Sequence, residues 1–291
     1  MKLGLGTVQF GLSYGVSNAV GKTSRDMVKD ILTLAVRRGI RVLDTAAGYG
    51  DSEEVLGNFI AADAPFRIVT KTAGNAAPSD RRSAWESGFA ASLKKLGRGQ
   101  IYGLLAHHAD DLTGADAGMM LDWLNTLKAE GLVQKIGASV YTAAQIDALL
   151  EHCSVDLIQL PLSLLDQRLI RSGHLDKLKR RGVEIHARSI FLQGLFLMAP
   201  DRLPPFFAPI QEHLAVCRAS LGDMGVTPLE AALGFMKDIA QVDVALCGVN
   251  NITQLDAICS AYEQNRHIVE PERFALWDDT FLNPANWPRT H

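Results

Sequence analysis

The sequence of 291 residues is poor in cysteine, in basic runs and in long apolar stretches, and each absence argues against a class of protein. The four cysteines stand far apart with no CxxC spacing, which disfavours a disulfide scaffold or a zinc knuckle and favours a reduced, cytoplasmic setting. The longest apolar stretches have only the length of a β-strand, so no segment is predicted to span a membrane. The net charge is −3 without a basic patch, and we therefore expect no nucleic-acid partner.

What the chain does contain is a repeated order of helix and strand signals. An amphipathic stretch ends in a polar or basic residue and a glycine, and an apolar run follows, as after Gly39, Gly131 and Gly182. A glycine directly after a helix typically closes it in the left-handed conformation. The apolar runs predict strands at roughly residues 3–8, 40–44, 66–71, 101–106, 134–138, 155–160, 183–188 and 243–248.

Strict alternation of strands and helices predicts parallel strands, because parallel neighbours need a helical crossover. Eight such units in a chain of this length predict an α/β protein of the (β/α)8 TIM barrel type, with a single domain over residues 1–291. A doubly wound sheet is the alternative, but no GxGxxG motif follows the first predicted strand. The segment 271–291 has no clear period, and we interpret it as a tail over one end of the barrel.

Polar side chains stand where several predicted strands end, and the active sites of such barrels gather at that end. Asp44 ends the second strand and Lys71 ends the third. His107 follows the fourth strand, while Tyr49 lies in the loop after Asp44. Each residue alone has an ordinary interpretation as a turn cap, a solvated charge or a packed ring. Their appearance in order on three neighbouring strands indicates one site.

These residue types suit the reduction of a carbonyl group, which needs a proton donor for the developing alkoxide. A free tyrosine has a pKa of about 10, and a close ammonium group stabilises the phenolate form. Lys71 supplies such an ammonium, Asp44 holds it in place, and His107 orients the carbonyl oxygen. A nicotinamide cofactor supplies the hydride in such reactions. The sequence thus predicts an oxidoreductase in which Tyr49 donates the proton.

The segments that carry these residues resemble the aldo-keto reductase family along nearly the whole chain. The segment with the pattern Asp-Thr-Ala-x-x-Tyr-Gly is specific when Lys and His follow at neighbouring strand ends. The matching segments are Leu3-Gly4-Leu5-Gly6-Thr7, Leu43-Asp44-Thr45-Ala46-Ala47-Gly48-Tyr49-Gly50, Val69-Thr70-Lys71, Leu104-Leu105-Ala106-His107-His108, Ile136-Gly137-Ala138-Ser139 and Gly248-Val249-Asn250-Asn251.

The resemblance implies a catalytic tetrad, a cofactor and a substrate class. The cofactor is expected to be NADP(H), extended across the mouth of the barrel, and the substrate is a small carbonyl compound; no metal is implied. The tetrad consists of Asp44, Tyr49, Lys71 and His107. The residues expected to hold the cofactor are Ser139 and Gln159 at the carboxamide, Arg188 at the nicotinamide, Ser189 and Gly194 along the pyrophosphate, and Gly248, Asn250 and Gln254 at the adenosine end.

Three departures from the family pattern stand in the same segments. Val140 occupies the position after the serine of strand five where asparagine is frequent. Arg188 stands where many members carry an aromatic residue that stacks on the nicotinamide. The stretch 248–254 has no lysine or arginine for an adenosine 2′-phosphate, a group that favours charged donors. NAD(H) is therefore an alternative to NADP(H).

Two other functions compete with carbonyl reduction. A metal-dependent hydrolase would use His107, His108 and Asp110, but neighbouring residues on a strand point in opposite directions and no HxH or HExxH spacing is present. A non-enzymatic, nicotinamide-binding regulatory protein is the second alternative, because a fold does not fix a function.

Loop residues give only weak signals about the substrate, and the sequence carries none for the oligomeric state. Polar residues at His108, Asp110 and Gln193 suit a hydroxylated, sugar-like aldehyde. A set of aromatic residues is compatible equally with an apolar pocket and with ordinary packing, namely Tyr14, Trp277, Phe281 and Trp287.

Overall fold

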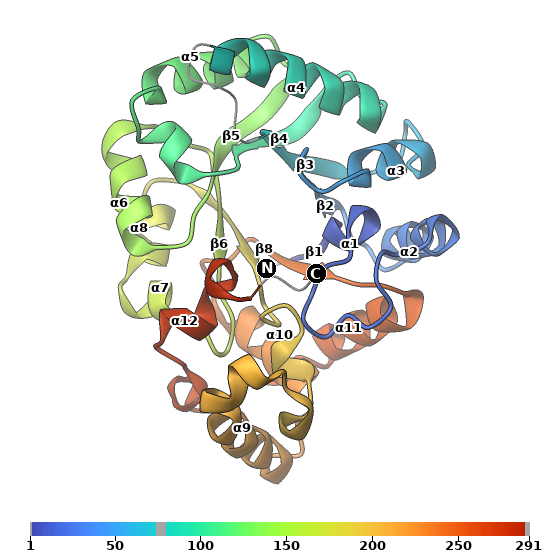
Figure 1. Ribbon diagram of the computed structural model, residues 1–291, viewed down its shortest axis with the longest axis vertical. Helices are drawn as coiled ribbons and strands as arrows, with labels where there is room; N and C mark the ends of the chain where they lie inside the picture. The colour runs from blue at the N-terminus through green and yellow to red at the C-terminus, as the bar shows by residue number, and fades with distance from the viewer. Residues whose placement is uncertain (1, 74–79, 289–291) are drawn as a thin grey trace.

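The computed structural model describes residues 2–73 and 80–288, and within them eight parallel strands form a closed barrel. Each strand pairs with its neighbours in chain order, and β1 closes the barrel against β8 (Figure 1). The strands are β1 (Lys2–Gly6), β2 (Val42–Asp44), β3 (Arg67–Lys71), β4 (Ile101–Ala106), β5 (Val133–Ser139), β6 (Leu157–Pro161), β7 (Glu184–Arg188) and β8 (Val244–Gly248). The predicted (β/α)8 barrel is confirmed.

Helices surround the barrel, as Figure 1 shows. Gly39, Gly131 and Gly182 follow α2, α5 and α8 with φ of +76°, +74° and +73°, so the left-handed helix ends are confirmed. None of the described helices combines the length and apolarity that crossing a bilayer requires. The helices of the outer layer are α2 (Arg25–Arg37), α3 (Ser52–Phe59), α4 (Arg81–Leu96), α5 (Ala117–Ala129), α6 (Ala143–His152), α8 (His174–Arg180), α10 (Pro228–Asp238) and α11 (Ile252–Gln264), with α1 (Val8–Gly11), α7 (Arg168–Arg171) and the 3-10 turn η2 (Ala109–Leu112) in the loops.

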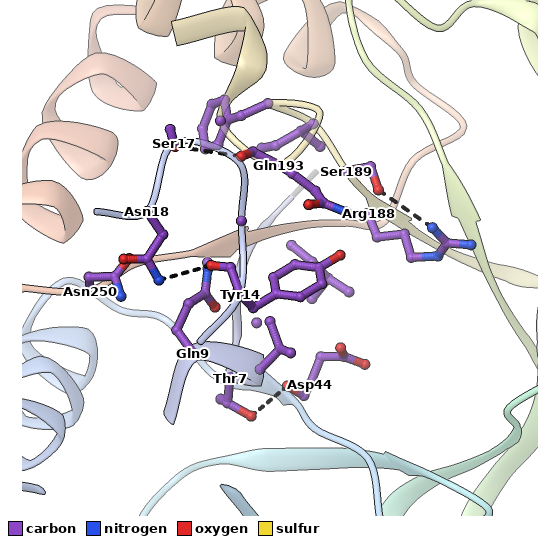
Figure 2. A pocket seen from close by; sticks show the side chains of 18 of the residues that line it. Thr7, Gln9, Tyr14, Ser17, Asn18, Asp44, Arg188, Ser189, Gln193 and Asn250 are labelled. Carbon is purple, nitrogen blue, oxygen red and sulfur yellow. Dashed lines mark hydrogen bonds between the residues drawn. The ribbon is translucent and has the colours of Figure 1, made fainter. Parts of the chain in front are cut away.

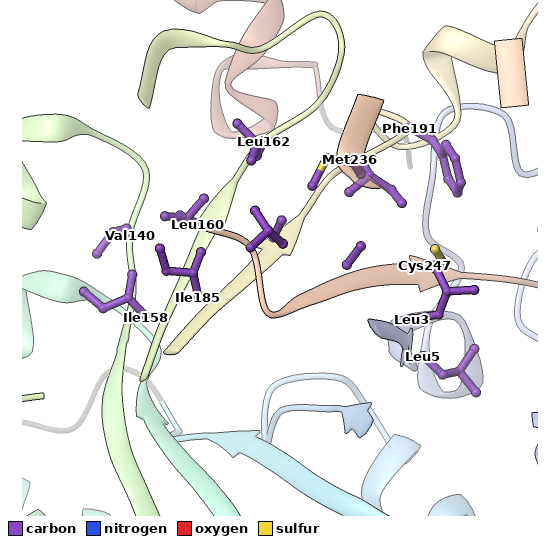
Figure 3. Close-up of a cluster of buried hydrophobic side chains, with 14 of the residues drawn as sticks. Leu3, Leu5, Val140, Ile158, Leu160, Leu162, Ile185, Phe191, Met236 and Cys247 are labelled. Atoms are coloured by element: carbon purple, nitrogen blue, oxygen red, sulfur yellow. The ribbon is translucent and has the colours of Figure 1, made fainter. Parts of the chain in front are cut away.

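Alternation along the strands separates an outer apolar face from an inner face that carries polar residues. Outward side chains such as Leu5, Ile158 and Ile185 are buried beneath the helices (Figure 3). Inside the barrel lies a smaller apolar cluster of Val42, Val69, Tyr102, Leu105, Leu157, Val244 and Leu246. Asp44, Lys71 and Gln159 stand two positions beyond Val42, Val69 and Leu157, so they share the inner face and lie above this cluster at the carboxyl end.

The first strand is shorter than predicted. It ends at Gly6, because Thr7 directs the chain into the short helix α1. Thr7 is fully buried, and its hydroxyl donates to the main-chain oxygen of Asp44 at 2.9 Å. This turn brings the first loop over the end of β2, close to the residues of the predicted site.

The interval between β7 and β8 is the longest, and it contains the 3-10 turns η3 (Leu195–Leu197), η4 (Pro200–Arg202) and η5 (Pro205–Ile210) before α9 (Gln211–Asp223). The segment 200–209, predicted as an irregular loop, forms two of these turns. Helix α10 begins at Pro228 behind a capping box, in which Thr227 accepts from the Glu230 amide while the Glu230 carboxylate accepts from the Thr227 amide.

The C-terminal segment contains η6 (Pro271–Phe274), α12 (Asp279–Leu282) and η7 (Pro284–Asn286). The Leu276 amide donates to Leu165 in the loop after β6 at 2.8 Å, and the Trp287 ring meets Phe207 of η5 edge-on at 4.9 Å. Residues 289–291 of the predicted tail lie outside the described residues. That the tail covers the barrel end stays a prediction.

Candidate active site

A cavity of about 450 Å³ opens inside the carboxyl end of the barrel, a volume typical of sites for small organic ligands. Parallel strands place their carboxyl ends at one mouth, so side chains from distant parts of the sequence meet there. All the predicted catalytic and cofactor-binding residues line this cavity: Asp44, Tyr49, Lys71, His107, Ser139, Gln159, Arg188, Ser189, Gly194, Gly248, Asn250 and Gln254.

A buried ion pair forms the floor of the cavity. The Lys71 ammonium donates to both carboxylate oxygens of Asp44, at 2.8 and 2.9 Å, and to the main-chain oxygen of Thr45 at 2.9 Å. The Lys71 side chain is 1% exposed. Burial alone lowers the pKa of a lysine, but the charge of Asp44 and the neighbouring Tyr49 outweigh it, and the pKa of Lys71 is raised. Lys71 is therefore a fixed positive charge.

Tyr49 lies directly beside this charge. Its hydroxyl oxygen is 3.4 Å from the Lys71 ammonium nitrogen, which also lies 4.9 Å from the centre of the Tyr49 ring. The loop that carries Tyr49 passes so close to α1 that a side-chain carbon on Gly11 would fall 1.8 Å from the Tyr49 main-chain oxygen. Glycine at position 11 therefore permits the close packing that holds the tyrosine loop in place.

His107, which follows β4 directly, completes the group. Its ring meets the Tyr49 ring edge-on at 6.1 Å, and its main-chain amide donates to the Thr72 hydroxyl at 3.2 Å. Burial, assisted by the charge of Lys71, lowers the pKa of His107 to about 4. The imidazole is therefore neutral near pH 7 and able to donate one N–H to a substrate oxygen.

His108 does not line the described cavity, although it follows His107 directly. The two rings stack at 5.2 Å instead of pointing in opposite directions, because β4 ends at Ala106 and strand alternation no longer applies. Among the described residues, no three histidine, cysteine, aspartate or glutamate side chains are grouped to hold a metal ion.

The residues expected at the nicotinamide are arranged to receive an amide. Ser139 and Gln159 are neighbours in the register of β5 and β6. The Gln159 amide nitrogen donates to the Asp44 carboxylate at 2.7 Å, which orients the side chain because a carboxylate only accepts. The Gln159 amide oxygen is buried and has no hydrogen-bond partner among the described residues. A buried acceptor of this kind fits the NH2 group of a nicotinamide carboxamide.

The loop after β7 runs along one wall of the cavity in a strained conformation. Ser189, Leu192 and Gln193 have φ of +60°, +48° and +55°, values that residues other than glycine rarely adopt. Residues 12–22, between α1 and α2, cross the cavity to meet this loop. There, the Ser17 amide and hydroxyl each donate to the Gln193 main-chain oxygen at 3.5 Å (Figure 2). Such strained loops cluster at ligand sites.

The end of the cavity beyond β8 carries no charged side chain among the described lining residues. The Asn250 amide donates to the Gln254 side-chain oxygen at 2.7 Å, and the Asn250 side chain donates to Gly21 at 3.2 Å. Among the described residues that line the cavity, the only lysine or arginine side chains are Lys71 and Arg188, and both stand at the strand-end side of it. The adenosine end predicted from the sequence thus offers amides and main-chain groups.

Several lining residues were not identified from the sequence, and some expected ones are absent from the lining. Gln9, Gly15, Tyr141 and residues 17–20 line the cavity, although their segments have no periodic pattern that predicts it. Tyr14 and Gln193 also line it. Asp110 and the tail aromatics are not among the described lining residues: Trp277 is stacked beneath Arg171 at 4.7 Å, and Phe281 and Trp287 pack near Phe207.

Comparison with known proteins gives a family model and several relatives. The model of the aldo/keto reductase family matches residues 2–277. The NADH-specific methylglyoxal reductase of Escherichia coli K12 is 28% identical over 218 residues, which cover 67% of this chain and 64% of that protein. The chain thus aligns with slightly less than two thirds of the length of that relative.

Solved structures show the same fold. An aldo-keto reductase from Bacillus halodurans in its holo form superposes with a TM-score of 0.74 at 20% identity, covering 94% of this chain and 90% of that one. The glycerol dehydrogenase of Gluconobacter oxydans gives a TM-score of 0.73 at 21% identity, covering 99% and 94%. At these identities the likeness concerns the fold alone.

Proposed function

The chain belongs to the aldo/keto reductase family, and from that premise we propose that it transfers hydride between a nicotinamide cofactor and the carbonyl carbon of a small substrate, with Tyr49 as the proton donor. The observation that carries the proposal is the contact of the Tyr49 hydroxyl with the buried Lys71 ammonium, 3.4 Å apart, at the floor of a cavity of ligand size. A tyrosine in this position loses its proton next to a positive charge that is already in place.

Each of the four tetrad residues has a separate role in the transfer of one proton. A nicotinamide held in the cavity would supply the hydride for the carbonyl carbon, and the carbonyl oxygen would then need a proton. Tyr49 gives its hydroxyl proton to that oxygen and becomes a phenolate, which Lys71 stabilises. Asp44 keeps Lys71 oriented through two short contacts, and neutral His107 donates its N–H to the substrate oxygen. Solvent returns the proton to Tyr49 after the alcohol leaves.

The cavity also has groups that suit the cofactor. The unpartnered Gln159 oxygen would accept from the carboxamide NH2, and the Ser139 hydroxyl would donate to the carboxamide oxygen. The loop from Ser189 to Gly194 would present main-chain amides to the pyrophosphate. Asn250 and Gln254 would contact the adenosine end, as the family resemblance implies.

We further propose that NADH is preferred over NADPH, in place of the NADP(H) preference that the sequence resemblance implies. The described lining has no lysine or arginine at its adenosine end, and a 2′-phosphate dianion there would lack a charged donor. The Escherichia coli relative is named as NADH-specific, which supports the same preference. Fluorescence titration with each cofactor measures it directly. Tighter binding of NADPH would contradict it.

Replacing Tyr49 by phenylalanine tests the proton donor. The change removes one hydroxyl and leaves the ring beside Lys71, so we expect cofactor Kd to stay the same while kcat/KM for aldehydes falls by about 10²- to 10⁴-fold. Tyr262→Phe, on α11 outside the cavity, is the matched control and should retain the wild-type rate. A Tyr49→Phe protein that reduces aldehydes at the wild-type rate would exclude Tyr49 as donor. Saturable NADH binding by the wild type with no turnover of any carbonyl would instead favour the regulatory alternative.

A further inference from the structure

Arg188 is a positive charge in the cavity that no carboxylate of the described residues neutralises. Two cationic side chains line the described cavity, and Lys71 is paired with Asp44, the only acidic residue in that lining. Arg188 makes no ion pair with any described residue. A partly buried guanidinium without a carboxylate is costly unless an anion arrives from outside. The charge balance of the cavity therefore favours an anionic ligand group near Arg188.

The guanidinium is held in place rather than left free to move. It lies 4.1 Å from the centre of the Tyr141 ring, and its Nη2 donates to the main-chain oxygen of Val140 at 3.0 Å. Nη1 lies 3.4 Å from the Ser189 hydroxyl. These two bonds leave other N–H groups of the guanidinium fork for a ligand. A fork fixed by stacking matches the two oxygens of a carboxylate or phosphate.

Tyr14 adds a neutral donor on the same side of the cavity. Figure 2 shows its ring crossing the cavity with the hydroxyl directed toward the side of Arg188. Desolvation of the hydroxyl, reinforced by nearby Tyr49, raises the pKa of Tyr14 to about 12. The hydroxyl therefore remains protonated under working conditions and can donate to an oxyanion.

The negative charges of the cofactor are the competing occupant, but the orientation of Arg188 disfavours them. The guanidinium bonds to Val140 beyond β5, whereas the loop 189–194 runs toward Ser17 and the proposed adenosine end. In Figure 2, Arg188 lies on the opposite side of Tyr14 from Asn18 and Asn250. The arginine thus points away from the proposed path of the pyrophosphate.

We propose that Arg188, assisted by Tyr14, binds an anionic group on the carbonyl substrate, either a carboxylate or a phosphate ester. This assigns Arg188 to the substrate, in place of the nicotinamide contact that the family resemblance implies. This proposal rests on the proposed function and narrows its substrate class to aldehydes or ketones that carry an oxyanion. The product of reduction is then a hydroxy acid or a phosphorylated alcohol. The hydride and proton steps are those given above, and the anionic group takes no part in them except to position the carbonyl.

Pairs of substrates that differ only in charge test the proposal. We would compare 4-oxobutanoate with 4-oxobutanamide for the carboxylate, and glyceraldehyde 3-phosphate with glyceraldehyde for the phosphate. Wild-type protein should prefer one anionic member. Arg188→Gln should lower kcat/KM for that member by about 10- to 100-fold, while its neutral partner changes by less than about threefold. Arg188→Lys keeps the charge and loses the planar guanidinium. Its kcat/KM for the anionic member should lie between the values of the wild type and of Arg188→Gln.

Controls separate a substrate role from a cofactor role and from misfolding. Arg171→Gln removes an arginine stacked on an aromatic ring outside the cavity and should leave both substrates unaffected. NADH titration of Arg188→Gln should give the wild-type Kd. Equal losses on the charged and neutral members, or weaker NADH binding, would overturn the proposal and assign Arg188 to the cofactor. A wild type that favours the neutral members would also overturn it.

Calorimetric titration of the protein–NADH complex with succinate and with inorganic phosphate distinguishes this proposal from the proposed function. Binding of either anion by the wild type that is lost in Arg188→Gln supports the anion site. If no carbonyl is reduced in the same preparation, that result refutes only the proposed function. Reduction of neutral aldehydes without binding or preference for either anion would refute the anion site and leave the proposed function standing.

Discussion

Lys71→Met is expected to destabilise the protein more than the loss of an ordinary ion pair. The substitution removes an ammonium that is 1% exposed and bonded to Asp44 and to the Thr45 main chain, and it leaves the 7% exposed Asp44 carboxylate without a cation. Breaking a buried ion pair on one side costs about 3–5 kcal/mol. Gln159 still donates to Asp44 at 2.7 Å, so we expect the lower end, about 3 kcal/mol.

The assay is a thermal and urea denaturation series at pH 7.5. A loss of about 3 kcal/mol lowers Tm by about 6–12 °C, at about 2–4 °C per kcal/mol. The control is Lys128→Met, which breaks a contact of the same kind with Asp156, at 2.7 Å but 41% and 31% exposed. Its expected cost is at most about 1 kcal/mol.

The expected loss arises from the Asp44 carboxylate that is left without its cation, and a double variant isolates this contribution. Asp44→Asn combined with Lys71→Met removes that charge and should restore about 1–2 kcal/mol relative to Lys71→Met alone. A Lys71→Met protein as stable as the wild type, or a double variant less stable than the single one, would refute the reasoning.

Two further predictions concern His107 and Gly11. Because burial, assisted by the Lys71 charge, lowers the pKa of His107 to about 4 while the unfolded chain takes up that proton near its ordinary value, stability should fall by about 3 kcal/mol as pH drops from 7 to 4. Urea denaturation at half-unit pH steps should show this slope in the wild type, and a His107→Asn variant with the same slope would contradict it. Gly11→Ala should lower both kcat and Tm, because the new carbon would fall 1.8 Å from the Tyr49 main-chain oxygen. Gly99→Ala, where nothing lies within 4 Å, is its control, and equal losses in the two variants would count against the packing argument.

The barrel and the floor of its cavity could be predicted from the sequence because both follow from short-range rules. Glycine after a helix, alternation along a strand and parallel connection by helices together bring Asp44, Lys71 and Gln159 to one mouth. The expected roles of Asp44 and Lys71 follow from their residue types, whereas the role of Gln159 is implied by the family resemblance. The exact strand ends were less predictable, since a single turn at Thr7 shortens the first strand.

Contacts between loops could not be predicted, because no period or cap fixes where a loop lies. Ser17 meets Gln193 across 176 positions, and Arg188 stacks on Tyr141 from another strand end. The aromatic residues of the C-terminal segment illustrate the same limit. From the sequence alone, Trp277 and Trp287 suit pocket lining and ordinary packing equally well. Their contacts with Arg171 and Phe207 in the structure show that both rings pack against other parts of the chain.

The pairing of β1 with β8 has a consequence for how the chain reaches its native state. Gly4 pairs with Leu246, so the last seam of the sheet joins two segments from opposite ends of the sequence. Contacts between residues so far apart in the sequence form slowly, because the chain loses the entropy of closing the whole loop before the contacts stabilise it. During synthesis, β1 would present an open edge until the final strand has left the ribosome. A protein of this topology is most exposed to aggregation in that interval rather than after closure, when no edge remains.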